Sequence, residues 1–312
     1  MTRDNWFDGL KFVLIFLVIF GHCRHFTITD DSLLSTKVVR YLIHSVYLFH
    51  MPLFILISGY FSKKTDNEKF IHSILRLLRI FIIFHILWLV VNILRGEAFS
   101  LNRLICPSFT LWYLLSLAYW RCILHIIPEK YNRATIILPF MFIVALLSGL
   151  IPLVNEFSIH RTFAFAPIFF LGYFAKRNNW LEIIRKPNLT WFLVPALILI
   201  FVENRINIDY YGRRPYVEYI DVLKRVLFLC SSIVISIAFI RIIPRKVSIF
   251  AEEGRDVLFY YVYHSFVLFL IAEIFCFAGI KASGVGLVVV SLSTLCLLFL
   301  GRKISVFHLP LK

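Results

Sequence analysis

The stretch DGLKFVLIFLVIFGHCRH, residues 8–25, decides the fold. Its apolar run from Phe12 to Phe20 leads into glycine and histidine, without the small-residue A-x-A site at which a signal peptidase cuts. A hydrocarbon core about 30 Å thick needs about 20 helical residues, so a stretch of this length is a candidate span. We therefore interpret it as a retained first membrane span.

The composition of the whole chain also indicates a membrane protein. Apolar residues make up 60% of the 312 residues and charged residues 16%, whereas soluble domains are roughly half apolar and about a quarter charged. The six cysteines are scattered singly with no metal-like spacing, so neither a disulfide framework nor a metal site is expected. These features exclude a soluble enzyme, a disordered chain and a disulfide scaffold.

Ten apolar segments are candidate spans, over residues 9–25, 41–60, 75–95, 104–125, 134–152, 161–176, 188–203, 221–243, 256–277 and 283–302. Helices are expected because lipid cannot satisfy open backbone groups and because the segments lack the alternation of a membrane barrel. We predict an all-α bundle of about ten transmembrane helices, with a single domain over residues 1–312.

The basic residues predict the orientation of this bundle. With the N-terminus inside and ten spans, the inner segments hold 21 of the 33 Lys and Arg residues, which predicts that both termini are cytoplasmic. This bias also accounts for the net charge of +15, so the expected partner is the lipid bilayer and not nucleic acid. The outer segment 204–220 is polar and aromatic; it could line a carbohydrate site or be an ordinary solvated loop.

Lys11 and His22 are ionisable residues inside the first span. They are 11 residues apart, which at about 100° per residue is three turns plus about 20°, so both side chains lie on one helix face about 16 Å apart. That face offers a cation at the inner surface and, deep in the span, an imidazole suited to proton transfer near neutral pH. A snorkelling lysine and a buried, hydrogen-bonded histidine would show the same spacing.

The second span carries FHMPLF at residues 49–54 and Ser-Gly-Tyr at 58–60. Pro52 is expected to bend the helix, and Gly59 to permit close approach of another helix. His50 places an imidazole beside the bend. It is a candidate for substrate binding, or it simply bonds a neighbouring backbone group.

Arg76 and Arg79 open the third span. Their i, i+3 spacing puts both guanidinium groups on one face at the cytoplasmic surface. There the two planar forks could clamp a phosphate. Snorkelling toward lipid headgroups is the alternative, and the pair alone favours it.

Two further residues are candidates for substrate binding. The sixth span has only 14 residues, over 162–175, so it must recruit His160 and Arg161 to cross the core, and Arg161 would then approach the outer face. His264 follows three tyrosines in the ninth span and could be structural instead.

These stretches together resemble the acyltransferase-3 family of integral membrane acyltransferases. In chain order, the resemblance rests on DGLK at 8–11 with GH at 21–22, FHMPLFILISGY at 49–60, Arg76-x-x-Arg79, LWYL at 111–114, RTFAFAPIFFLGY at 161–173 and GRDVLFYYVYH at 254–264. The 161–173 stretch is similar to the fucose 4-O-acetylase-like branch. Lys11 departs from the arginine that many members carry, and Ala166 departs from the aromatic residue usual in that branch.

The resemblance implies an O-acetyltransferase that moves an acetyl or other acyl group from acyl-CoA, usually acetyl-CoA, to a carbohydrate hydroxyl. The implied site residues are His22 and Lys11 for catalysis, Lys11, Arg76 and Arg79 for donor binding, and His50, Arg161 and His264 for substrate binding. His22 would be the general base or a transient acyl carrier, and no metal would be required. The acceptor would be an exopolysaccharide, capsule, O-antigen or lipid-linked sugar, and the location the bacterial plasma (inner) membrane.

Two other classes fit part of the sequence. A transporter or flippase for a polysaccharide precursor would also have about ten spans with buried histidine and arginine, but the sequence shows no internal repeat. A non-catalytic scaffold or sensor would leave the alignment of Lys11 with His22 unexplained.

Overall fold

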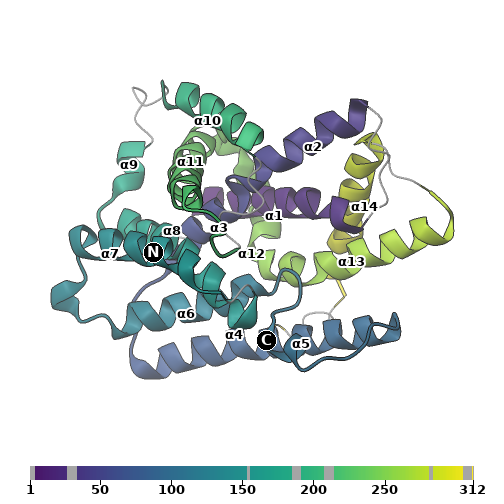
Figure 1. Cartoon of the computed structure of the whole chain (residues 1–312), viewed down its shortest axis with the longest axis horizontal. Helices are drawn as coiled ribbons and strands as arrows, with labels where there is room; N and C mark the ends of the chain where they lie inside the picture. Colours follow the sequence, from purple (N-terminus) through teal and green to yellow (C-terminus); the bar gives the residue numbers. More distant parts are fainter. Residues whose placement is uncertain are drawn as a thin grey trace.

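The computed structural model describes residues 4–26, 34–152, 155–184, 191–206, 214–280, 284–304 and 311. Within these ranges the regular structure is helical throughout, which confirms the all-α prediction. The main helices (Figure 1) are α1 (Asn5–Phe26), α2 (Leu34–Tyr47), α3 (His50–Phe61), α4 (Asn67–Leu94), α6 (Trp112–Ile126), α7 (Ala134–Leu147), α8 (Ile159–Arg177), α10 (Leu193–Ile206), α11 (Ile220–Ile242), α13 (Val257–Phe277) and α14 (Gly284–Arg302). The short helices in the connections are α5 (Asn102–Ile105), α9 (Trp180–Ile184) and α12 (Ala251–Arg255).

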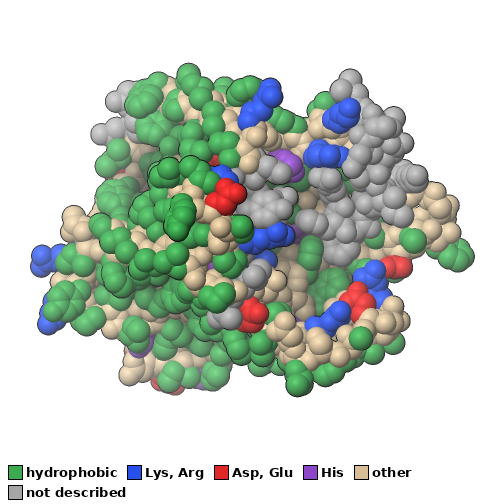
Figure 2. Space-filling view, in the orientation of Figure 1, with side chains coloured by type: hydrophobic (Ala, Val, Ile, Leu, Met, Phe, Trp, Pro, Cys, Tyr) green, Lys and Arg blue, Asp and Glu red, His purple; other side chains and the backbone are tan. Residues whose placement is uncertain are grey.

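Six segments of the described chain are long and apolar enough to cross a membrane: Asn5–Cys23, Thr36–Phe61, Asn67–Leu94, Ile220–Ile242, Val257–Phe277 and Gly284–Arg302. The chain is therefore a multi-pass membrane protein. The other four predicted spans contain the helices α6, α7, α8 and α10, which have 14 to 19 residues. Hydrophobic side chains cover the surface over α7, α10 and α11 in Figure 2, as contact with lipid requires. The count of ten spans and the cytoplasmic termini stay predictions.

The second predicted span is two helices and not one. α2 ends at Tyr47 and α3 begins at His50. Pro52 has no N–H, and in a continuous helix its ring would clash with the carbonyl of Leu48, which lies in the break. The bend that we predict at Pro52 is therefore a full interruption, and it places His50 in the first turn of α3.

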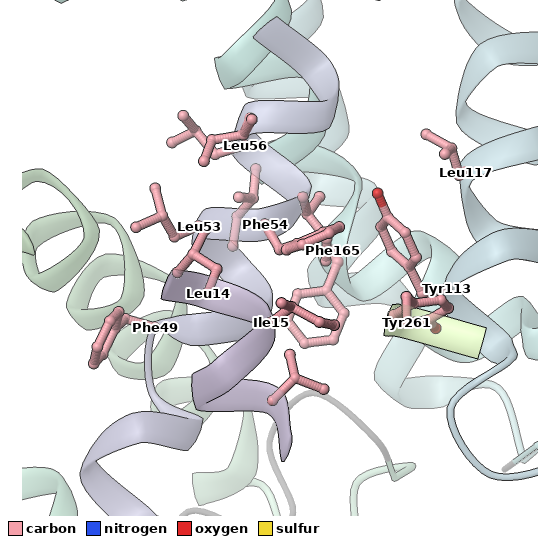
Figure 3. Packing of buried hydrophobic residues seen from close by; sticks show 14 of the residues in the cluster. Leu14, Ile15, Phe49, Leu53, Phe54, Leu56, Tyr113, Leu117, Phe165 and Tyr261 are labelled. Atoms are coloured by element: carbon pink, nitrogen blue, oxygen red, sulfur yellow. The ribbon is translucent and has the colours of Figure 1, made fainter. Parts of the chain in front are cut away.

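α3 and α8 cross with their backbones in contact. A Cβ atom at Gly59 would lie 1.9 Å from the carbonyl oxygen of Phe169, and one at Gly172 would lie 1.9 Å from that of Leu56. Glycine is required at both positions, which confirms the prediction that Gly59 permits close helix approach. Buried hydrophobic side chains of α1, α3 and α8 pack next to one another in this part of the core (Figure 3).

The third predicted span begins earlier than the sequence suggests. The carboxylate of Asp66 caps α4 by accepting a hydrogen bond from the backbone N–H of Lys69 (N–Oδ1 2.9 Å). α4 therefore starts at Asn67. Arg76 and Arg79 lie inside the helix and do not open it.

The fourth predicted span begins later than residue 104. α5 ends at Ile105, and α6 starts only at Trp112. Residues 106–111 form a connection between the two helices. This connection contributes to a cavity described below.

Three connections that are cytoplasmic in the predicted ten-span layout, at residues 61–74, 126–133 and 177–187, lie together in their described parts. Glu129, in the connection after α6, pairs with Lys64 after α3 (Oε2–Nζ 3.6 Å) and with Arg177 at the end of α8 (Oε1–Nη2 2.6 Å). Hydrogen bonds from Asn132 and Arg177 lower the pKa of the Glu129 carboxyl. These contacts join the three segments at one end of the bundle.

Candidate functional site

The three predicted site histidines meet in the interior of the bundle. His22 lies near the end of α1, His50 in the first turn of α3 and His264 within α13. The imidazole centroid of His22 is 6.4 Å from that of His50 and 5.6 Å from that of His264, to which it is nearly parallel. We refer to His22, His50 and His264 as the histidine cluster.

Two of these rings have a defined proton position. The Nδ1 atoms of His50 and His264 each lie 2.7 Å from a backbone carbonyl oxygen, of Val46 and Tyr261 respectively. A carbonyl only accepts, so each Nδ1 carries the proton and each Nε2 carries a lone pair. Neither Nε2 has a hydrogen-bond partner among the described residues, although both rings are fully buried. Buried polar atoms normally have partners, so the cluster is suited to receive a polar group of a ligand.

Tyr47 orients the ring of His22. The Tyr47 hydroxyl oxygen is 2.9 Å from His22 Nδ1 and 3.2 Å from the carbonyl oxygen of Gly21. The phenol donates its proton to the carbonyl, so it accepts from His22 Nδ1–H, and the lone pair of the imidazole is on Nε2. Gly21 allows this contact, because a Cβ there would lie 3.1 Å from the tyrosine ring.

A cavity of about 590 Å³ lies between α1, α3, α4, α6 and α13. The lysine and arginine side chains that line it are Lys11, Arg76, Arg121 and Arg255. Lys11 Nζ lies 3.0 Å from the buried carboxylate of Asp8, to which Arg255 comes within 3.9 Å. None of the described residues that line the cavity is acidic. Four cations beside one buried carboxylate make this cavity attractive to a ligand with several negative charges.

Aromatic side chains close the cavity on the side of the histidine cluster. Tyr113 of α6 and Tyr261 of α13 have ring centroids 5.4 Å apart, and Phe54 of α3 packs against both (Figure 3). All three side chains line the cavity. The backbone of Tyr261 in turn binds His264, so a single residue connects the cavity with the cluster.

Lys11 and His22 share one face of α1, as their spacing predicts. Lys11 Nζ lies 4.7 Å from the ring centroid of Phe61 at the end of α3, and Lys11 lines the cavity together with α13. His22 contacts His50 of α3 and His264 of α13. Both side chains therefore lie between the same two helices, Lys11 at the cationic cavity and His22 in the cluster.

Two predicted residues lie outside these features. Arg79 is exposed and does not line the cavity. Arg161 lies in the first turn of α8, which does include His160 and Arg161, as the shortness of its apolar segment predicts. Its guanidinium is 5.3 Å from the ring of Trp112 and donates to Asn155 (Nη2–Oδ1 3.2 Å).

Three residues of the site are not among the sequence-based candidates. Arg121 and Arg255 line the cavity, but in the sequence they count only as topology signals or as part of a motif. Arg121 carries a usable signal, because it is an ionisable residue within the apolar segment 104–125. Tyr47 carries no such signal, because tyrosine is not one of the charged or histidine residues whose presence inside a span is costly.

The histidine cluster is not arranged as a metal site. In the part of the chain that the structure describes, no group of three or more His, Cys, Asp or Glu side chains could hold a metal ion. Buried ionisable groups beside a cationic cavity, in a multi-pass helical bundle, instead mark a functional site within the membrane.

A family model, the acyltransferase domain of the acyltransferase-3 type, matches residues 4–302. The chain therefore belongs to the acyltransferase-3 family. Its assignment to the fucose 4-O-acetylase-like branch stays a prediction.

Two curated relatives match part of the chain. "Nodulation protein NolL" of Sinorhizobium fredii (strain NBRC 101917 / NGR234) is 42% identical over 67 residues, which is 20% of this chain and 17% of that protein. "Nodulation protein NolL" of Mesorhizobium japonicum (strain LMG 29417 / CECT 9101 / MAFF 303099) is 48% identical over 71 residues, 22% of this chain and 18% of that protein. The matches thus cover 17% and 18% of the length of these relatives. No solved structure matches the chain.

Proposed function

We propose that this protein is a membrane O-acetyltransferase. It moves an acetyl or other acyl group from cytoplasmic acyl-CoA to a hydroxyl group of a cell-surface or lipid-linked carbohydrate, in the bacterial plasma membrane. The observation that carries the proposal is the histidine cluster beside the cationic cavity. Family membership supports acyl transfer as the reaction.

The cationic cavity suits the CoA part of the donor. CoA carries several phosphate charges, and the guanidinium groups of Arg121 and Arg255 can bond phosphate oxygens. Arg76 donates from Nε and Nη2 to the carbonyl oxygen of Leu311 (3.1 and 2.8 Å), and it would exchange this acceptor for a phosphate oxygen. Lys11 adds a fourth cation, held at the cavity by Asp8. The predicted cytoplasmic position of this end supports the assignment, because acyl-CoA is made in the cytoplasm. The thioester would then approach the histidine cluster along Tyr113 and Tyr261.

His22 acts as the general base in the first of two possible routes. Its Nε2 takes the proton of the acceptor hydroxyl, whose own pKa is far too high for ionisation at neutral pH. The acceptor oxygen attacks the thioester carbonyl, the C–S bond breaks, and the leaving thiolate takes a proton from the imidazolium. The lone pairs on His50 and His264 can accept hydrogen bonds from further hydroxyl groups of the sugar.

His22 carries the acyl group in the second route. Nε2 attacks the thioester carbonyl and CoA leaves as the thiolate. The acceptor hydroxyl then attacks the acyl-imidazolium, the acyl–nitrogen bond breaks, and the hydroxyl proton passes to the thiolate. Both routes need the lone pair on Nε2 and a neutral Nδ1–H, which is the tautomer that Tyr47 supports.

The test is thioester consumption by purified protein in lipid nanodiscs. Acetyl-CoA is supplied with a panel of p-nitrophenyl glycosides, released CoA thiol is measured, and acetylated glycoside is detected by mass spectrometry. His22→Ala should reduce turnover about 100- to 10,000-fold, because it removes the general base. His125→Ala is the matched control, since His125 stacks on Phe70 outside the cluster.

Two results would contradict the proposal. Normal turnover by a well-expressed His22→Ala variant would remove His22 from the mechanism. Wild-type protein that consumes no acetyl-CoA, but moves a labelled lipid-linked sugar across proteoliposomes, would favour the transporter or flippase.

A further inference from the structure

A second cavity, of about 390 Å³, lies at the opposite end of α4 from Arg76. Six of its lining residues are Trp88, Asn92, Glu97, Arg103, Ser108 and Phe109. Acidic and basic side chains gather at this end near α5 and the end of α13 in Figure 2, and Glu97 pairs with Arg103 (Oε2–Nη1 2.6 Å). A sugar has apolar C–H faces and a rim of hydroxyl groups. Aromatic faces beside amide, carboxylate and guanidinium groups match both features.

Phe109 connects this second cavity with the histidine cluster. Its ring centroid is 4.9 Å from that of His22 and 6.2 Å from that of Trp88. The side chain thus lines the cavity and contacts the imidazole. The Phe109 ring therefore lies between the second cavity and His22, as Tyr261 lies between the cationic cavity and His264.

The backbone at Phe109 is strained and fixed from both sides. Its φ of 43° lies in the left-handed region that bulky residues rarely adopt. On one side, the N–H and hydroxyl of Ser108 donate to Nδ1 of His85 (3.2 and 2.9 Å). On the other side, the Tyr261 hydroxyl donates to the carbonyl of Thr110. Strain of this kind persists only where the surrounding structure holds it, and it is concentrated at functional sites.

We propose that the second cavity binds the acceptor carbohydrate and that Phe109 is the gate between this acceptor and His22. The inference rests on the proposed function, because only a transferase needs an acceptor. Donor and acceptor then reach the same imidazole from two cavities that share no lining residue. Without an acceptor, the Phe109 ring shields His22 from water and limits hydrolysis of the acyl donor.

The first test separates acceptor binding from donor binding. Asn92→Ala and Glu97→Gln should raise the KM for the p-nitrophenyl glycoside acceptor about 5- to 30-fold, the effect of losing one or two kcal/mol. The KM for acetyl-CoA should stay unchanged. Asn102→Ala and Glu273→Gln are matched controls, because both residues are exposed at the same end and neither lines the cavity. Unchanged acceptor KM in both test variants, with normal wild-type turnover, overturns the acceptor site and leaves the proposed function standing.

The second test concerns the gate. Phe109→Gly removes the ring at a position whose backbone conformation glycine adopts without strain, so the variant should fold. Hydrolysis of acetyl-CoA without acceptor should rise several-fold, whereas Phe99→Gly, at an exposed phenylalanine of the same end, should not change it. Hydrolysis at the wild-type rate in Phe109→Gly overturns the gate.

The third test measures binding without turnover. Cys106 lines the second cavity and is kept while every other cysteine is replaced. A small methanethiosulfonate reagent labels it, and at least one glycoside of the panel should slow the labelling. Protection without thioester consumption supports the sugar site and contradicts the proposed function. Labelling that no glycoside slows overturns the inference, whatever the turnover.

Discussion

Tyr47 gives the sharpest test of how His22 is oriented. Tyr47→Phe removes one hydroxyl group and keeps the ring, whose centroid is 5.9 Å from that of His22. The Nδ1–H of His22 and the carbonyl of Gly21 then lose an oxygen that lies 2.9 and 3.2 Å from them. These bonds are half-buried, and loss of one partner of such a hydrogen bond costs about 1–3 kcal/mol. If this cost falls on the transition state, turnover slows about 5- to 150-fold.

The assay is thiol release at saturating acetyl-CoA and glycoside. Tyr47 contacts the imidazole and neither substrate in the proposed mechanism, so kcat should fall while the KM for acetyl-CoA stays near the wild-type value. Tyr41→Phe is the matched control, because Tyr41 lies on the same helix and is 42% exposed. Thermal unfolding of both variants separates lost orientation from lost fold. Wild-type kcat in a folded Tyr47→Phe variant would refute the proposal that Tyr47 sets the tautomer of the His22 ring.

Two further predictions concern the donor end. Arg76→Ala or Arg121→Ala should raise the KM for acetyl-CoA about 5- to 30-fold. Arg79→Ala, at a residue outside the cavity, should leave this KM unchanged. If a donor titration shows a larger effect for Arg79→Ala, the phosphates of CoA do not bind in the cavity. Glu218→Cys should label with a membrane-impermeant thiol reagent on intact cells, and Glu68→Cys should not, in protein whose native cysteines are replaced. The reverse pattern would place the cationic cavity on the side that has no acyl-CoA.

The apolar segments predict the class of fold because a membrane span needs a long hydrophobic run, and hydropathy measures that directly. Helix ends depend on other forces. The start of α4 is set by the cap that Asp66 provides, and this polar turn lies outside the apolar run. The predicted start at 75 therefore misses the first turns of the helix.

The sequence predicts the relative positions of site residues only where these residues belong to the same helix. Lys11 and His22 belong to α1, so helical geometry alone places them on one face. His50 and His264 can be named from their chemistry, but their approach to His22 depends on how α3 and α13 pack against α1. The sequence around Arg121 does not show whether its side chain points to lipid headgroups or into a cavity. The packing of the neighbouring helices determines the orientation.

The break before α3 shows how the local sequence and the site depend on each other. Phe49 N–H and His50 Nδ1–H both donate to the carbonyl of Val46 (3.1 and 2.7 Å), so one backbone oxygen bridges the interruption and sets the proton position of the His50 ring. Tyr47, the last residue of α2, reaches His22 from the same break. Pro52 is visible in the sequence as the cause of an irregularity. Its consequence is that Tyr47 of α2 and His50 of α3 both lie beside the imidazole of His22. This arrangement depends on the path that α2 takes across the end of α1, which the sequence does not show.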